Sequence, residues 1–218
     1  MSTPVSSTGE VAPAFQSRPL LLLVSGPAGS GKTTLCARLT DAFPAQIRRV
    51  ITCTTRPPRG AERDGEDYHF FSRSEFEARV TAGEFLENAL VHGNLYGTRK
   101  ADVYSLLAGG FDLLLNLDVQ GAGTVRETAR DDATLRRSLV SLFLMPPGRA
   151  ELEARLAGRG TETAVEMARR LRTAEEEMLH WPNYDYCLIS GGREEDFERA
   201  KAVYLAEKMR VRHSASSI

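Results

Sequence analysis

The segment Gly26–Thr33, with the sequence GPAGSGKT, constrains this chain more than any other. It fits the phosphate-binding loop pattern G-x-x-x-x-G-K-[ST], in which glycines let successive backbone N–H groups point at one anion. The apolar run 20–24 precedes it and suits a buried parallel strand. Leu35, Leu39 and Phe43 follow at helical spacing, so a helix N-terminus would add partial positive charge beneath the phosphates. Strand, loop and helix together predict a nucleoside triphosphate site.

Within this loop, two side chains carry the chemistry. We expect the Lys32 ammonium group to reach the terminal phosphates and the Thr33 hydroxyl to bind Mg²⁺ together with water. Apart from Pro27, which has no N–H, the remaining loop residues are expected to hold the phosphates of a nucleoside triphosphate through their backbone N–H groups. The residues predicted to bind this triphosphate are Gly26, Pro27, Ala28, Gly29, Ser30, Gly31, Lys32, Thr33 and Thr34.

Composition narrows the class of protein only broadly. Hydrophobic residues make up 42% of the 218 residues, enough for a sizeable core. The formal net charge of −1 gives no reason to expect nucleic acid or an anionic membrane as a partner. Cys36, Cys53 and Cys187 are scattered, which favours free thiols in a reducing cytoplasm. We see no signal peptide, no apolar run near the ~18 residues of a spanning helix, and no signal for an oligomeric state.

Strand and helix patterns alternate along the chain and predict an α/β fold of the P-loop NTPase type, a parallel sheet with helices on both faces. Ligands of such folds bind at the carboxyl ends of the strands. Strands are predicted at 20–24, 47–52, 111–118, 139–145 and 186–190, and helices at 32–43, 100–107, 120–130, 149–157, 163–180 and 193–210.

Residues 50–100 interrupt this alternation with turns and short alternating stretches, which predict a small, mostly β insertion. It holds a hairpin at 92–94 and a short helix whose buried side would carry Phe76 and Val80. We therefore predict one domain at 19–211 between a disordered tail at 1–18 and a flexible C-terminus at 212–218. Its parts are a core at 19–49, 101–145 and 173–211, the insertion at 50–100, and a helical lid at 146–172.

Two groups of arginines lie outside the phosphate loop. Arg56 and Arg59 flank two prolines that stiffen the turn, and their forked guanidinium groups suit phosphate oxygens, with Tyr68 adding a hydroxyl. The alternative is a solvated basic turn. Arg155 and Arg159 lie one helical turn apart, and Arg170 follows on the next helix; here the alternative is a surface helix with salt bridges.

A phosphate loop with two further arginine groups indicates two phosphorylated ligands, a nucleoside triphosphate at Lys32 and a phosphorylated acceptor at Arg56 and Arg59. A phosphate monoester is largely dianionic at neutral pH. Transfer to it therefore needs positioning and charge neutralisation rather than a general base.

Several motifs closely resemble the guanylate kinase family. They are TCTTRPPRG at 52–60, GEDYHF at 65–70, GEFLE at 83–87, HGNLYGT at 92–98, DVQG at 118–121 and RLAGRGTET at 155–163. The resemblance covers roughly residues 20–210 in the same order. It implies a cytoplasmic enzyme of purine nucleotide metabolism that phosphorylates GMP and dGMP with ATP and Mg²⁺.

By position, the resemblance implies a role for each matching residue. Glu87 would bind the guanine edge, and a carboxylate suits this role because guanine offers two adjacent donors while adenine does not. The GMP residues implied are Thr52, Arg56, Arg59, Tyr68, Glu87, Tyr96, Thr98 and Asp118. The catalytic residues implied are Lys32, Arg56, Arg155, Arg159 and Arg170, the last three closing over the transferred phosphoryl group.

The chain departs from the family pattern at two places. Asn116 stands where the family usually has an aspartate, which predicts weaker organisation of Mg²⁺. The segment 190–192, Ser-Gly-Gly, replaces an asparagine and acidic residues near the adenine of ATP, so contacts to the donor base are not assigned. Two other functions stay open: a guanylate-kinase-like phosphopeptide-binding module, and a P-loop kinase for another phosphorylated small molecule, such as a sugar phosphate.

Overall fold

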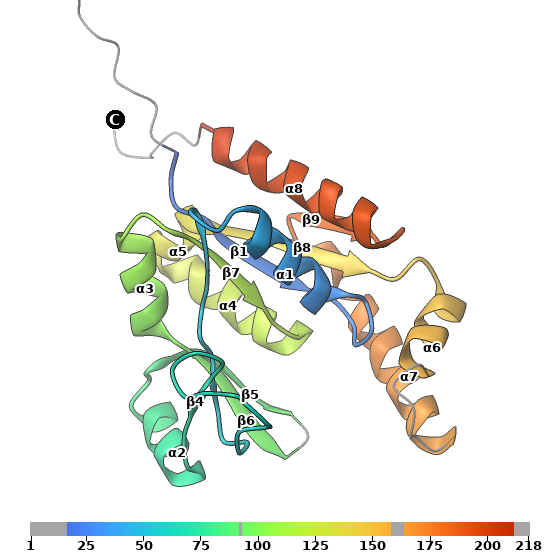
Figure 1. Cartoon of the computed structure of the whole chain (residues 1–218), viewed down its shortest axis with the longest axis horizontal. Helices are drawn as coiled ribbons and strands as arrows, with labels where there is room; N and C mark the ends of the chain where they lie inside the picture. The colour runs from blue at the N-terminus through green and yellow to red at the C-terminus, as the bar shows by residue number, and fades with distance from the viewer. Residues whose placement is uncertain (1–16, 92, 158–163, 212–218) are drawn as a thin grey trace, which may run out of the picture.

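The computed structural model describes residues 17–91, 93–157 and 164–211. Its central sheet has five parallel strands in the order β2-β7-β1-β8-β9 (Figure 1). The strands are β1 (Leu21–Ser25), β2 (Ile47–Arg49), β7 (Asp112–Asn116), β8 (Leu139–Met145) and β9 (Tyr186–Ile189). The predicted strand at 47–52 is too long, because β2 pairs with β7 only over its three residues before the chain leaves this sheet.

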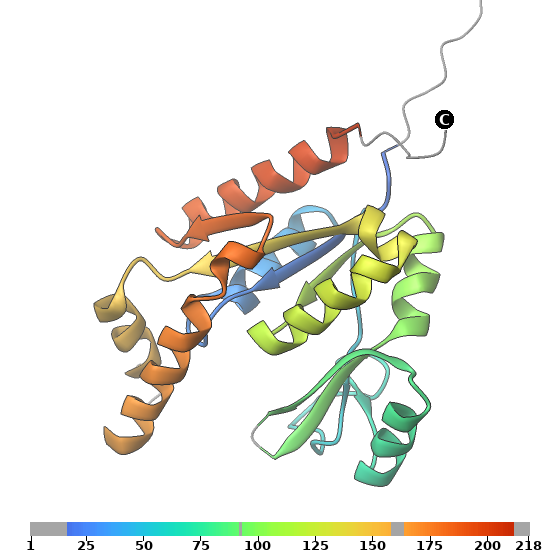
Figure 2. The same cartoon turned by 180° about the vertical axis from the view of Figure 1, so that it is seen from behind.

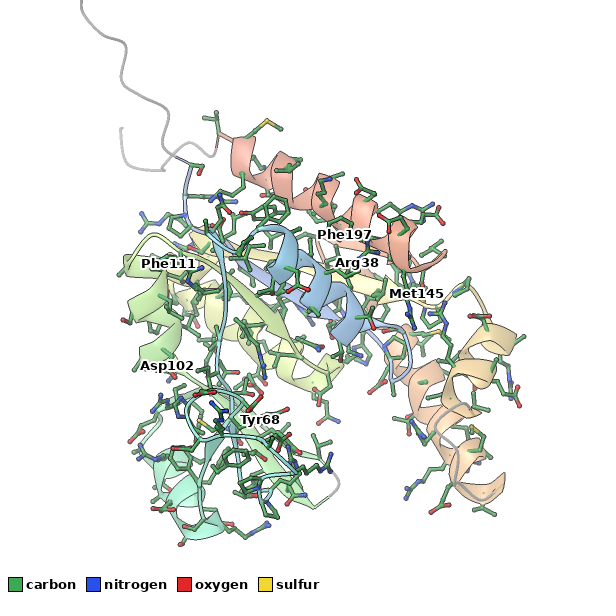
Figure 3. The ribbon with its side chains drawn as sticks, viewed as in Figure 1. Arg38, Tyr68, Asp102, Phe111, Met145 and Phe197 are labelled. Atoms are coloured by element: carbon green, nitrogen blue, oxygen red, sulfur yellow. The ribbon has the colours of Figure 1, made fainter. Side chains whose placement is uncertain are left out.

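Helices cover both faces of this sheet, which confirms the predicted fold class. On one face lie α1 (Lys32–Ala42) and α8 (Arg193–Met209), whose apolar side chains share one core cluster. Phe197 of α8 is part of it, and the Arg38 guanidinium of α1 lies 4.5 Å from the Phe197 ring centroid (Figure 3). On the other face, a second cluster includes α3 (Lys100–Ala108), α4 (Val119–Asp131) and α5 (Ala133–Ser138).

The six-residue α5 was not predicted. It is too short to show a helical repeat, and it begins because the Asp132 carboxylate accepts a hydrogen bond from the Leu135 N–H at 2.8 Å. Leu135 is then buried against the second cluster. A cap of this kind is the local signal that could have revealed the helix.

A second sheet of four strands, in the order β4-β3-β6-β5, lies within residues 50–100. Its elements are β3 (Cys53–Thr54), β4 (His69–Phe70), α2 (Arg73–Thr81), β5 (Phe85–Val91) and β6 (Asn94–Arg99). Phe76 of α2 is buried and stacks on Phe85 with ring centroids 4.4 Å apart. The prediction that Val80 shares this buried face is wrong: its side chain is 37% exposed, since Phe76 alone fills the contact of this short helix with the sheet.

The helices α6 (Arg149–Ala157) and α7 (Ala164–Met178) form a separate pair with its own apolar cluster of Leu152, Leu156, Leu171 and Ala174. Figures 1 and 2 show this pair and the small sheet projecting from the same side of the core. The short helix η1 (Trp181–Asn183) links α7 to β9. Within the described ranges, no helix is both long and apolar enough to cross a membrane.

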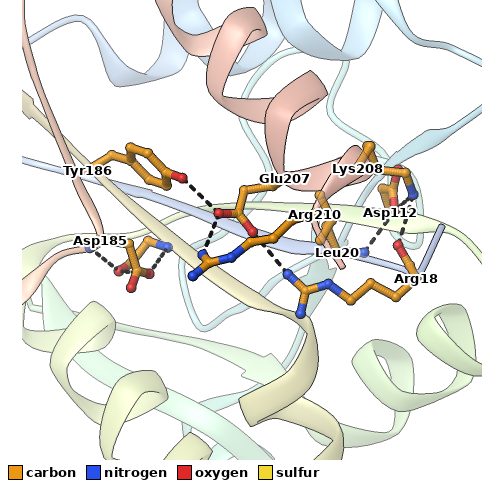
Figure 4. A network of polar contacts seen from close by, with 9 residues as sticks. Arg18, Leu20, Asp112, Asp185, Tyr186, Glu207, Lys208 and Arg210 are labelled. Carbon is orange, nitrogen blue, oxygen red and sulfur yellow. Dashed lines mark hydrogen bonds and ion pairs between the residues drawn. The ribbon is translucent and has the colours of Figure 1, made fainter. Parts of the chain in front are cut away.

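Polar contacts close the end of the sheet opposite the phosphate loop (Figure 4). Asp112 accepts hydrogen bonds from the Leu20 N–H at 2.8 Å, the Lys208 ammonium group at 2.8 Å and the Tyr204 hydroxyl at 2.6 Å. Glu207 binds Arg18, Tyr186 and Arg210. These contacts attach α8 to the start of β1. Most of the predicted tail, 1–16, and the predicted C-terminus, 212–218, lie outside the described residues.

Candidate active site

The phosphate loop joins β1 to α1 at the carboxyl end of the sheet. Gly26 has φ 143°, and a Cβ there would lie 2.4 Å from the Leu144 carbonyl oxygen, so only glycine fits. The Lys32 ammonium group donates hydrogen bonds to the carbonyl oxygens of Gly26 at 2.7 Å and Pro27 at 2.9 Å. The loop therefore keeps its lysine folded over the backbone that is predicted to hold the phosphates.

Asn116, at the end of β7, lies between the phosphate loop and a neighbouring hollow. Its side-chain amide donates a hydrogen bond to the Thr33 hydroxyl at 3.3 Å. Asn116 also lines a hollow of about 210 Å³ between the two sheets. The hollow is lined by Thr52, Tyr68, Glu87, Ala89, Val91, Tyr96, Gly97, Asn116, Leu117 and Asp118, which include five of the eight predicted GMP-binding residues.

Glu87 of β5 is the buried carboxylate of this hollow, with 4% of its surface exposed. Thr98, its cross-strand neighbour on β6, donates its hydroxyl to Glu87 Oε1 at 2.6 Å. Burial raises the pKa of Glu87 to about 7, the nearby Asp118 charge adds to this, and the Thr98 hydrogen bond opposes it. One carboxylate oxygen is thus fixed by the protein, and the pocket holds an acceptor whose charge is costly until a donor binds it.

Gly121, in the first turn of α4, limits the space behind Glu87. A Cβ on Gly121 would lie 3.0 Å from Glu87 Oε2. Asp118 caps the same helix by accepting the Gly121 N–H at 2.8 Å, so its carboxylate both orders α4 and lines the hollow. The DVQG motif carried this signal in its glycine, but sequence reasoning gave Gly121 no role.

Arg56 lies beside the hollow with 7% of its side chain exposed. Its guanidinium group forms a two-pronged ion pair with Glu62, at 2.9 and 3.0 Å, and lies 5.4 Å from the ring centroid of Tyr68. Glu62 also accepts the Arg59 N–H at 2.7 Å, and these bonds hold its pKa below the usual value. Glu62 was missed by sequence reasoning. Glu62 holds the guanidinium group of Arg56 in one orientation through two hydrogen bonds. The Arg59 side chain, in contrast, is exposed.

A second hollow, of about 340 Å³, lies on the other side of the loop. It is lined by Gly29, Ser30, Gly31, Thr34, Leu35, Glu151, Arg155, Ser190, Gly192, Arg193 and Asp196. The Arg155 guanidinium group reaches the Ser190 hydroxyl at 3.2 Å and the Ser30 carbonyl at 3.4 Å, and it pairs with Glu151. Arg193 and Asp196, to which the sequence assigned no role, complete the lining of this hollow.

The remaining predicted arginines are placed less fully. Arg170 is half-buried on α7, and Arg159 lies outside the described residues. A larger hollow of about 700 Å³ lies behind α4, lined in part by Arg126 and Arg136, but none of the predicted site residues lines it. The 210 and 340 Å³ hollows on either side of the loop are therefore the candidate active site.

The burial of Glu87 gives a prediction for stability. Folding raises its pKa from 4.5 to about 7, so the empty protein loses stability as the pH rises through this window. Glutamine does not ionise, so Glu87→Gln does not lose stability in this way. We expect its unfolding free energy to exceed that of the wild type by about 3 kcal/mol at pH 8 and by little at pH 4.5. Urea denaturation at both pH values measures this. A difference independent of pH would contradict it.

A phosphate loop next to a pocket with a buried carboxylate and an ordered arginine defines a nucleoside monophosphate kinase with the P-loop fold. The family model described as guanylate kinase matches residues 16–206. The chain belongs to the guanylate kinase family.

Relatives and a solved structure agree with this family. A guanylate kinase of Cereibacter sphaeroides is 42% identical over 193 residues, covering 88% of this chain and 89% of that protein. One of Symbiobacterium thermophilum is 42% identical over 200 residues, covering 91% of each. The crystal structure of guanylate kinase from Anaplasma phagocytophilum has a TM-score of 0.68 at 30% identity and covers 90% of this chain and 89% of that chain.

Proposed function

We propose that this protein transfers the γ-phosphoryl group of ATP to GMP, and to dGMP, with ADP and GDP or dGDP as products. A phosphate oxygen of the acceptor forms the new P–O bond while the bond to the β-phosphate oxygen of ATP breaks. The observation that carries this proposal is a pair of contacts made by one residue: Asn116 lines the hollow that contains Glu87, and its amide contacts Thr33 of the phosphate loop. The acceptor and donor sites are therefore adjacent.

Each side of the site has a proposed role. Glu87 accepts the guanine N1–H and 2-amino groups, and Thr52, Thr98 and Asp118 complete the base pocket. The GMP phosphate is bound by Arg56, Arg59, Tyr68 and Tyr96, with Glu62 keeping Arg56 in place. Lys32, Arg155, Arg159 and Arg170 neutralise the charge that spreads over the transferred group.

The residues beside the loop also fit Mg²⁺. The Thr33 hydroxyl is exposed and can supply one hard oxygen, leaving the other positions to phosphate oxygens and water, as this ion prefers. Mg²⁺ would neutralise phosphate charge there. Within the described residues, no cluster of three acidic, His or Cys side chains offers a cage made of protein alone.

Asn116 sets how strongly the protein holds this ion. Its amide hydrogen points at the Thr33 hydroxyl, whereas an aspartate would accept a hydrogen bond from that hydroxyl and add a negative charge. We expect Asn116→Asp to lower the Mg²⁺ concentration for half-maximal rate about fivefold. Steady-state rates across a Mg²⁺ titration measure this, with the exposed Asn88→Asp as control. An unchanged midpoint would refute the role given to Asn116.

An acceptor panel tests the proposed function. ADP release should be fast with GMP and dGMP, and at least about 100-fold slower in kcat/KM with AMP, because adenine leaves the buried carboxylate without donors. Ribose 5-phosphate should be a poor acceptor. Equal rates with GMP and ribose phosphate would favour a kinase for sugar phosphates. Phosphopeptide binding without turnover would favour the phosphopeptide-binding module.

We place this reaction in the cytoplasm. Cys36, Cys53 and Cys187 are free thiols, and the first two are buried, a state that a reducing compartment preserves. GMP, dGMP and ATP are the proposed small-molecule partners.

A further inference from the structure

The α6–α7 pair rests directly on the phosphate loop. A Cβ on Gly29 would lie 3.1 Å from Leu156 Cδ2 and 3.6 Å from Leu152 Cδ1, so the leucines of α6 pack against the bare backbone of the loop. Both leucines are fully buried. The loop is thus in contact with the helices whose arginines are proposed to act on the transferred group.

Glu177, in the last turn of α7, adds a polar contact to this packing. Its carboxylate oxygen Oε2 accepts a hydrogen bond from the Ala28 N–H at 3.3 Å, across 149 residues of sequence. Burial raises the pKa of Glu177 and the nearby Asp118 charge acts in the same direction, whereas the Ala28 hydrogen bond, Lys32 and His180 oppose this rise. A carboxylate of the chain therefore lies where the backbone N–H groups and the lysine are arranged for anions.

This position is in conflict with a bound nucleotide. The Ala28 N–H belongs to the loop whose amides hold donor phosphates, and a phosphate oxygen and Glu177 Oε2 compete for that hydrogen. The two groups also repel each other because both are negative, and the repulsion is moderate because the contact is exposed and water screens it. Binding of the donor must break or weaken the contact between α7 and the loop.

We propose that Glu177 is a positioning residue that latches α7 to the empty phosphate loop and is displaced by the donor phosphates. Release of the latch frees the last turn of α7, and the pair α6–α7 then moves relative to the loop, which brings Arg155 and Arg170 to the transferred group. Donor binding is thereby coupled to lid closure. This inference rests on the proposed function, because it needs ATP to occupy the loop.

Glu177→Gln tests the latch without removing the hydrogen bond. Glutamine keeps an oxygen for the Ala28 N–H but carries no charge, so ATP no longer has to displace an anion. We expect the Kd for ATP, measured by calorimetry on the full chain, to fall about three- to tenfold. Glu176→Gln is the matched control, since Glu176 is the exposed neighbour on the same helix, and its Kd should stay within twofold of the wild type.

Hydrogen exchange gives a second readout that a merely structural role would not produce. In the wild type, ATP should speed exchange of the amides in the last turn of α7, and in Glu177→Ala this turn should exchange fast before ATP is added. An unchanged or weaker ATP affinity in Glu177→Gln would overturn the latch, as would slower exchange of this turn on ATP binding.

The two proposals fail in different ways. If the wild type phosphorylates GMP while Glu177→Gln binds ATP like the wild type, the latch alone is wrong. If the wild type binds no ATP at all, the proposed function and the latch are both wrong.

Discussion

Replacing Glu87 with glutamine will lower kcat/KM for GMP by about 100- to 1,000-fold. The glutamine oxygen can serve only one of the two adjacent guanine donors, and its own amide hydrogens face the other donor. The lost charge-assisted hydrogen bond and the unpaired donor together cost a few kcal/mol. Steady-state kinetics with varied GMP at saturating ATP measure the effect, and KM for ATP should stay within twofold because Glu87 lies on the acceptor side.

Two comparisons separate this loss from misfolding. Glu84→Gln changes an exposed carboxylate that pairs with Arg79 just before the same strand, and it should retain almost all activity. Glu87→Gln should itself be more stable than the wild type at pH 8, because glutamine places no charge in the buried position. A variant that is stable and still prefers GMP over AMP would show that Glu87 does not select the base.

Replacing Lys32 with methionine will lower kcat by about 1,000-fold. Methionine keeps much of the side-chain length but loses the ammonium group, which binds two loop carbonyls in the empty protein and is proposed to follow the phosphoryl group during transfer. Rapid-quench single-turnover kinetics with excess enzyme measure the chemical step directly. GMP binding, measured separately, should change little, because Lys32 does not line the Glu87 hollow.

Lys100→Met is the matched control for charge removal. Lys100 donates a hydrogen bond to the Gly83 carbonyl at 2.9 Å at an exposed position, and its loss should leave kcat within twofold. If Lys32→Met turned over GMP at nearly the wild-type rate, transfer would not depend on the phosphate loop. If Lys32→Met also kept its binding to a phosphopeptide that the wild type binds, the alternative of a phosphopeptide-binding module would gain support.

The local parts of this protein could be predicted from its sequence. The phosphate loop, β8 and α6 follow from patterns carried by neighbouring residues, and β8 at 139–145 and α6 at 149–157 have the predicted limits. The guanylate kinase motifs also named five of the ten residues that line the Glu87 hollow. The short helix α5 was not predicted, because its six residues are too few to show a helical repeat.

The energetics of the site came only from the tertiary structure. The pKa of Glu87 is raised because folding removes water from a carboxylate and sets Asp118 close to it, and no spacing in the sequence states how deeply a side chain is buried. The packing of Gly121 against Glu87 joins α4 to β5, and Glu177 reaches Ala28 across 149 residues. Sequence by itself determined which chemical groups this protein has for two nucleotides, since motifs and periodicity are local. The tertiary structure decided which of these groups lie in contact and how much free energy an ionised side chain costs in the site. Both depend on contacts between distant segments and on the exclusion of water.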